Sequence, residues 1–331
     1  MVDSEKFANA EIARLDITDD MFQRQLELVA SRVKQPNEGL FGPESMMWQL
    51  SRHALAGGHG AGRALMLQIA HPWVTRGIDQ HSETRADPLG RAARTFTAVL
   101  SIVYGSLEQA LREAVIVHDV HSKIVGTLAQ KSGAFAKGSD YRANEAHAML
   151  WVHATLWDTT VLMHELFVKP LTRQQKEAFY EETRLFAYMF GIPDHILPPN
   201  WHEFVEYNQR MWDSDQLTVT DATRELAGFL FEPLHWVLTP AMSWLKVVTS
   251  ATLNQRLRED FRLEFGPKEQ RFFRVGQKAI HIVDKFAPAI VRHGPTYIEA
   301  QRRLQGKPST WLTRRLTQVM LGREELVSVR S

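Results

Sequence analysis

The sequence of 331 residues predicts an all-α protein. Three observations lead to this fold class. Apolar residues recur at three- and four-residue spacing over most of the chain, which is the period of one helix face. These runs begin after Ser, Thr or Asp and end near Gly or Pro, the residues that cap and terminate helices. We find no alternating strand pattern, no Asn-Gly hairpin turn and no internal repeat.

The expected helices follow one another along the chain. The first begins after the capping residues Asp16 and Thr18 and stops before Pro36. Asp87-Pro88 is a strong start, because Asp caps free N–H groups and Pro fits the first helical position. The glycines at 57–62 predict a loop between two helices. We expect helices over residues 17–34, 44–56, 61–70, 72–77, 88–104, 106–129, 144–168, 172–190, 200–212, 217–229, 240–264, 268–286 and 296–303.

The chain organisation predicts one large domain. Hydrophobic residues make up 44% of the chain, enough for a substantial core. The apolar stretches 148–167 and 231–253 contain too many ionisable residues for a lipid-facing span, so we expect buried helices there. The sequence therefore predicts a helical domain at 41–305, an N-terminal helical extension at 1–40 and a polar C-terminal tail at 306–331.

Charge and the N-terminal sequence suggest a cytoplasmic protein. The formal net charge is +1 and the charges are interspersed, so nothing global points to nucleic acid or to an anionic membrane surface. The N-terminus lacks the basic and apolar regions of a secretory signal. We therefore expect no nucleic-acid partner and no stable membrane insertion.

The chain has no cysteine, which excludes several kinds of site. Iron–sulfur clusters, thiolate-ligated haem, Cys-rich zinc sites, covalent c-type haem and cysteine nucleophiles all require sulfur. Redox chemistry would have to use imidazole, carboxylate or an organic cofactor. The fourteen histidines are therefore the main candidates for metal or cofactor ligands.

Many polar and ionisable residues stand in the otherwise apolar, helix-forming stretch 68–121. Buried groups of this kind are costly unless they are paired or bound, so their density favours a cofactor. His118 and His121 lie three residues apart on one expected helix and project from neighbouring positions. They could be two metal ligands, or one ligand and its partner. The ordinary alternative is a pair of surface or packed histidines.

A second pair of residues in this stretch could hold an anion. Arg91 and Thr95 lie one helical turn apart, and both can donate hydrogen bonds to a carboxylate or phosphate. The alternative is a helix surface on which Arg91 forms a salt bridge with Asp87 or Glu83.

Further histidines lie in apolar surroundings. His153 and His164 project from nearly the same face of a very apolar helix. We expect core histidines bonded to a neighbouring group, with support of a metal ligand as the alternative. His71, before Pro72, could terminate a helix by bonding to its carbonyls.

A series of short motifs appears in order over about residues 40–215. The series is Leu65-Met-Leu-Gln68-Ile-Ala70-His71-Pro72, His81-Ser82, Asp87-Pro88-Leu-Gly-Arg91, Thr95, Gly105, His121-x-x-Ile-x-Gly126, Tyr141-x-Ala143, Trp151-Val-His153-Ala, Pro170-Leu-Thr, Tyr180-x-Glu182 and Gly191-Ile-Pro193. In this order the motifs resemble the oxygenase family that includes the latex clearing protein, a rubber oxygenase, and the mpaB-type oxygenases.

The resemblance implies a globin-like helical domain around a non-covalent b-type haem. It implies that His121 is the proximal iron ligand, that His118 and His153 lie close to that site, and that Arg91 and Thr95 lie near the haem. Neutral imidazole is a good ligand for haem iron.

One position departs from the family pattern, and one family residue has no clear counterpart here. Arg94 stands where the latex clearing protein has a lysine that can occupy the distal iron position. Arginine stays protonated and has no lone pair for iron, so this capping should be absent. The distal glutamate proposed as a base in rubber cleavage has only Glu83 as a candidate counterpart.

Together these features predict a haem b-dependent oxygenase, an oxidoreductase that uses O2 on a small apolar substrate such as an isoprenoid or another alkene. His121 is the candidate metal ligand. Arg91, Thr95 and Glu83 are the candidate catalytic residues. The candidate cofactor-binding residues are His118, His121, Arg91, Thr95 and His153.

Three alternatives stay open. A non-catalytic haem-binding or gas-sensing protein would have both axial iron positions filled by protein. A peroxidase-like enzyme using H2O2 would need an acid–base residue on the distal side, with His71 or His81 facing the iron. A degenerate family member would have lost the cofactor.

Overall fold

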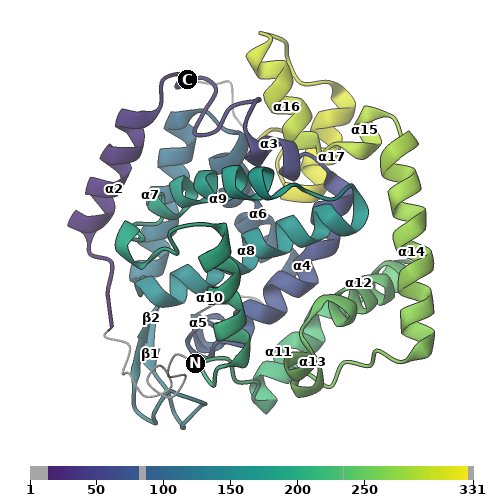
Figure 1. Ribbon diagram of the computed structural model, residues 1–331. Coiled ribbons are helices and arrows are strands. Elements are labelled where there is room, and N and C mark those ends of the chain that lie inside the picture. The colour runs from purple at the N-terminus through teal and green to yellow at the C-terminus, as the bar shows by residue number, and fades with distance from the viewer. Residues whose placement is uncertain (1–13, 82–86, 234, 327–331) are drawn as a thin grey trace.

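The computed structural model describes residues 14–81, 87–233 and 235–326. Helices dominate, which confirms the all-α prediction, and the described residues also form one two-stranded antiparallel sheet (Figure 1). The elements before residue 145 are α2 (Asp19–Arg32), α3 (Met46–Ser51), α4 (Ala54–Ile69), α5 (Pro72–His81), α6 (Pro88–Tyr104), α7 (Leu107–Ser122), β1 (Val125–Thr127) and β2 (Asp140–Arg142).

Helices also make up the rest of the chain. They are α8 (Ala146–Phe167), α9 (Arg173–Tyr188), η1 (Asp194–Ile196), α10 (Trp201–Asp213), α11 (Asp221–Phe231), η2 (Trp236–Leu238), α12 (Thr239–Thr252), α13 (Gln255–Asp260), α14 (Pro267–Phe286), α15 (Ala289–Arg292), α16 (Pro295–Leu304) and α17 (Trp311–Leu321). No helix among the described residues is long and apolar enough to cross a membrane.

The antiparallel pair α4 and α8 forms the centre of the fold. Near one end, the indole N–H of Trp151 donates to the carbonyl of Leu67 over 2.9 Å, and the Gln68 amide donates to Thr155 Oγ1 over 3.1 Å. These bonds satisfy polar groups inside the core, as burial requires. The other helices pack around this pair. Most of the buried apolar side chains of α4 and α8 belong to one main cluster, while Ala56, Met163 and Phe167 belong to a smaller cluster.

The prediction of a loop at Gly57–Gly62 is wrong, because α4 continues through these glycines. A Cβ on Gly60 would lie 2.6 Å from Thr159 and 2.9 Å from Met163 of α8. A Cβ on Gly62 would overlap with the Thr249 hydroxyl of α12. Because these two glycines carry no side chain, the helices α4, α8 and α12 can pack closely together here. Burial of their surfaces outweighs the low helix propensity of glycine.

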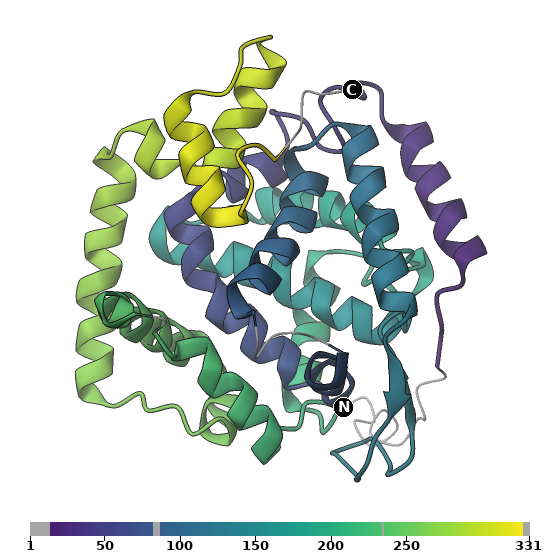
Figure 2. The same cartoon turned by 180° about the vertical axis from the view of Figure 1, so that it is seen from behind.

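Helices α6 and α7 form an antiparallel hairpin, since only Gly105 and Ser106 separate them (Figure 2). Ser106 and Gln109 cap α7 reciprocally, the Ser106 N–H donating to Gln109 Oε1 over 2.8 Å. The hairpin places the first turn of α6, with Arg91, at the same end as the last turn of α7, with His121.

Helix α7 stops at Ser122, seven residues short of the predicted end at residue 129. The chain then forms β1, whose residue Val125 pairs with Arg142 of β2. Strands of three residues are too short to show an alternating pattern, which explains why the sequence did not predict them.

The C-terminal region differs from expectation in two places. The predicted helix at 240–264 is two helices, because Asn254 caps a new helix, α13, with its side chain. Helix α17 lies inside the expected polar tail and packs on α16 and α6, with Thr313, Thr317 and Leu321 buried. A mostly polar buried stripe hides such a helix from hydrophobic periodicity. The division into three segments otherwise stays a prediction.

Candidate functional site

His121 lies partly buried in the last turn of α7, on the same helix face as the buried residues Ala110, Ala114 and His118. Its Nδ1 atom is buried and has no hydrogen-bond partner among the described residues. Burial is the main reason that the pKa of His121 is lowered to about 4. Nearby His118 lowers this pKa further, whereas Asn144 raises it. The ring is therefore neutral at physiological pH, the form that can ligate iron.

Helix α5 and the β-hairpin lie beside the segment that follows His121. A Cβ on Gly77 of α5 would lie 3.3 Å from Ile124. The Tyr141 hydroxyl of β2 donates to Gln80 of α5 over 2.6 Å. Gly126 is necessary here, because a Cβ on it would lie 2.6 Å from the same hydroxyl. The absence of a side chain at Gly126 therefore makes room for the Tyr141 ring.

His118 has a different environment from His121. Its ring stacks on Phe22 of α2, with centroids 4.0 Å apart and planes inclined by 3°. Nε2 lies 2.9 Å from Asp19 Oδ1, and Nδ1 lies 3.4 Å from the Asn144 amide nitrogen. With both nitrogens engaged, His118 connects α7 to α2 and leaves no free lone pair for a metal.

The start of α6 concentrates positive charge. Arg91 is partly buried, and its pKa is lowered by burial and then by Arg94. Arg94 is exposed and lies 3.4 Å from Asp87, so within the described residues the Asp87 salt bridge forms with Arg94. Thr95 is exposed, and its hydroxyl donates to the Arg91 carbonyl over 3.1 Å. This end of α6 could therefore accept an anionic group.

The predicted catalytic residue Glu83 lies outside the described residues, as does the side chain of His81. In the sequence, residues 82–86 follow α5 and precede α6.

His153 lies in the interior of α8. The indole N–H of Trp157 donates to its Nδ1 over 3.2 Å, while its Nε2 is buried without a partner among the described residues. Burial lowers its pKa to about 3. Its aromatic neighbours are Trp157 and Phe186, so His153 belongs to the contact between α8 and α9.

His71 is buried at the turn between α4 and α5. Its ring packs against Trp73 and Phe135, and its Nδ1 has no partner among the described residues. Burial lowers its pKa to about 3. It therefore sits in an aromatic cluster as a neutral ring.

The sequence analysis missed one cluster of titratable groups. His53 Nδ1 lies 2.9 Å from Asp284, and both are buried. The rings of His164 and His293 lie 5.3 and 5.9 Å from the His53 ring. Only tertiary contacts join these distant residues, so no sequence spacing could reveal them. No group of three or more His, Asp or Glu within the described ranges is arranged to hold a metal ion.

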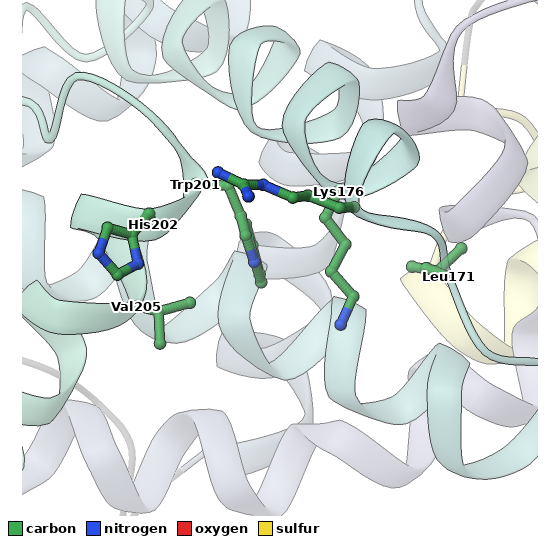
Figure 3. A pocket seen from close by; sticks show the side chains of 6 residues that line it. Leu171, Lys176, Trp201, His202 and Val205 are labelled. Atoms are coloured by element: carbon green, nitrogen blue, oxygen red, sulfur yellow. The ribbon is translucent and has the colours of Figure 1, made fainter.

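Two surface pockets that described residues line do not include His121 in their lining. One of about 530 Å³ lies where α9 and α10 begin (Figure 3). Lys176 faces it beside Trp201 and also forms an ion pair of 2.9 Å with Glu165. The other, of about 330 Å³, lies between α11 and α12. Neither is lined by a predicted catalytic, cofactor-binding or metal-binding residue.

Comparison with known proteins identifies one family. The family described as "ER-bound oxygenase mpaB/B'/Rubber oxygenase, catalytic domain" matches residues 48–282. Two similar relatives are the uncharacterised proteins Mb2261 of Mycobacterium bovis and Rv2237 of Mycobacterium tuberculosis. Each is 26% identical over 233 residues, which cover 68% of this chain and 87% of the relative. No solved structure matches the chain significantly.

Proposed function

This chain belongs to the mpaB and rubber oxygenase catalytic-domain family, and on that premise we propose that it is a haem b-dependent oxygenase. The proposed substrates are O2 and a small apolar organic molecule that contains an alkene, such as an isoprenoid. The family match supports oxygenase activity. The proposal that haem is the cofactor and His121 its ligand is based on the chemistry of the residues at the end of α7.

The observation that carries the proposal is the neutral, partly buried imidazole of His121. Haem iron needs one protein ligand on its proximal side, and an imidazole can serve only when it is unprotonated. Burial keeps His121 in that form, since it lowers the pKa to about 4. Its buried Nδ1 has no partner among the described residues, so one polar atom of the ring still needs a partner.

The start of α6 fits the acidic side of the same cofactor. Haem carries two carboxylates, and Arg91 is a partly buried cation whose neighbour Arg94 is another cation. A carboxylate held by Arg91 would relieve the repulsion between these guanidinium groups. Thr95 and the half-exposed Phe96 lie on the following turn and supply a hydroxyl and an apolar surface.

In this proposal the chain supplies ligand, orientation and access. His121 would hold the iron, Arg91 and Thr95 would hold the haem edge, and the hydrogen bond from Tyr141 to Gln80 would keep α5 beside the site. His118 would position α7 through Asp19 and Phe22. Bound haem would supply the activation of O2. Glu83 stays the proposed base, and His153 a proposed supporting residue.

An absorbance spectrum of the purified protein tests the cofactor. We expect a Soret band after expression with a haem supply, and a shift of that band when CO is added to the reduced protein. His121→Ala should abolish the band. The matched control is His118→Gln, three residues earlier on the same helix, which should keep it. A normal band in the His121 variant would refute the ligand assignment.

Activity needs a separate measurement. We expect O2 consumption with an isoprenoid alkene, and label from isotopically enriched O2 in the product. Turnover with H2O2 alone would favour the peroxidase alternative. A reduced protein that binds haem but not CO would favour the non-catalytic alternative.

A further inference from the structure

Helix α14 presents two different surfaces. One face packs on the protein: Gly276 lies against the Trp244 ring of α12, and the Gln277 amide donates to the Leu166 carbonyl of α8 over 3.0 Å. The opposite surface is strongly apolar although it is open to solvent. Its large side chains are Phe272, Val275, Ile282, Val283 and Phe286, which are 48, 60, 56, 44 and 73% exposed. Phe272 stands at the border of the two faces, since its ring also lies 5.5 Å from that of Trp244. We call these five residues the α14 stripe.

The stripe is continuous along the helix. At about 100° per residue, its five members fall within one arc of roughly 100° on the helix surface. In both views α14 runs along the outer edge of the molecule (Figures 1 and 2). Isolated exposed apolar residues are ordinary, but an ordered stripe of this kind marks an interaction surface.

Positive charge accompanies the stripe. The acidic residues of α14 form hydrogen bonds within the protein. Glu269 accepts from the Gly266 N–H, and buried Asp284 is hydrogen-bonded to His53. Five cations on the same helix point to solvent. They are Lys268, Arg271, Arg274, Lys278 and Lys285. The outer surface of α14 is therefore both apolar and cationic.

The whole C-terminal segment has the same character. Residues 267–331 contain thirteen Lys and Arg and five Asp and Glu, a formal charge of +8, so residues 1–266 carry −7. Eleven of the twenty-two exposed large hydrophobic side chains of the described residues lie in the same segment. The near-zero net charge of the chain conceals this separation.

We propose that the α14 stripe docks this protein on the surface of an anionic phospholipid bilayer. A basic amphipathic helix lies in the plane of such a surface, with apolar side chains in the acyl boundary and cations against lipid phosphates. The exposed phenyl ring of Phe286 and the exposed aliphatic side chains of Val275 and Ile282 supply the apolar contact. The neighbouring lysines and arginines supply the charge complementarity.

Other occupants fit this surface less well. A symmetric contact with a second copy would place the same cationic segment against itself, which costs electrostatic energy. A nucleic acid would pair with the cations but would leave the aliphatic stripe in water, because its contacts are dominated by phosphates.

Vesicle flotation with the full-length protein tests the proposal. We expect the protein to bind vesicles of phosphatidylglycerol and phosphatidylcholine, and to bind pure phosphatidylcholine at least tenfold more weakly. The double variant Val275→Glu with Phe286→Glu should lose most of the binding. Lys278→Glu with Lys285→Glu should weaken binding by at least tenfold and flatten its salt dependence.

The matched control is Leu28→Glu with Val205→Glu, which adds two acidic residues at exposed apolar positions on other helices, 39 and 42% exposed. This control should bind like the wild-type protein, and circular dichroism should show that every variant is folded. The proposal would be overturned if the control lost as much vesicle binding, if the protein bound neutral vesicles equally well, or if it bound duplex DNA more tightly. It would also be overturned if the protein formed a concentration-dependent dimer that Val275→Glu dissociates while vesicle binding persists. The measurement needs no haem, so it is independent of the proposed function.

Discussion

The indole N–H of Trp157 donates a hydrogen bond of 3.2 Å to Nδ1 of His153, one turn earlier on α8. Indole can only donate, so the imidazole must accept at Nδ1 and carry its proton on Nε2. That Nε2 is buried and has no partner among the described residues. Because burial lowers the pKa of His153 to about 3, the ring stays neutral and keeps this tautomer.

Replacing the donor should therefore destabilise the protein. Trp157→Phe leaves the buried Nδ1 of His153 without a partner, which costs on the order of 1–3 kcal/mol, in addition to the loss of indole packing. Urea unfolding of the two single variants Trp157→Phe and His153→Leu, and of the double variant, measures the coupling. We expect the double variant to be less destabilised than the sum of the singles. Strict additivity would show that the bond contributes nothing.

The buried histidines predict acid sensitivity. Burial lowers the pKa of His164 from 6.5 to about 4, with a smaller effect of His53. Between these two values the unfolded chain binds more protons than the folded chain. The free energy of unfolding should therefore be at its full value above pH 6.5 and fall as the pH drops towards 4. For His164 alone the loss is on the order of 3 kcal/mol.

A variant isolates the contribution of this residue. Both ring nitrogens of His164 are buried without partners among the described residues, so His164→Leu removes two unsatisfied groups. We expect little change in stability at pH 7 and a smaller loss between pH 6.5 and 4. An unchanged slope in the His164 variant would contradict the assignment.

Gly126→Ala should disturb the segment after His121. The new Cβ would lie 2.6 Å from the Tyr141 hydroxyl and 2.8 Å from the ring carbon that bears it, so the ring must move away from Gln80. Overpacking of this kind costs roughly 1–3 kcal/mol. Thermal unfolding should show the loss, and adding Tyr141→Leu should relieve part of it. Tyr141→Phe should not relieve it, because the ring carbons stay in place.

Arg94→Lys tests the distal side of the proposed haem site. The wild-type side chain is exposed, pairs with Asp87 and cannot ligate iron. A lysine can ligate when it is deprotonated, so we expect the variant to bind CO more weakly and to show an altered absorbance spectrum as the pH rises. Arg94→Gln is the matched control and should bind CO like the wild-type protein. Identical behaviour of the lysine and glutamine variants would remove Arg94 from the distal pocket.

Local interactions made much of this fold predictable. The residues Asp87 and Pro88 alone predict where α6 begins, and Ser106 and Gln109 alone predict where α7 begins. The same local order of motifs indicated the oxygenase family, which the match over residues 48–282 confirms. The candidate residues His121 and Arg91 stay predictions, although the fold brings them to the same end of the α6–α7 hairpin.

Long-range packing decided the rest. Whether Gly60 ends a helix or lies inside one depends on how closely α8 approaches, and the sequence around Gly60 does not encode that distance. Whether the side chains of α14 are core or surface depends on which face α12 and α8 cover. The sequence by itself determined where helices start and which family this chain belongs to, because caps and motifs act within a few residues. Only the tertiary structure decided that His53 lies against Asp284 and that the α14 stripe faces solvent, because burial depends on contacts between segments far apart in the chain.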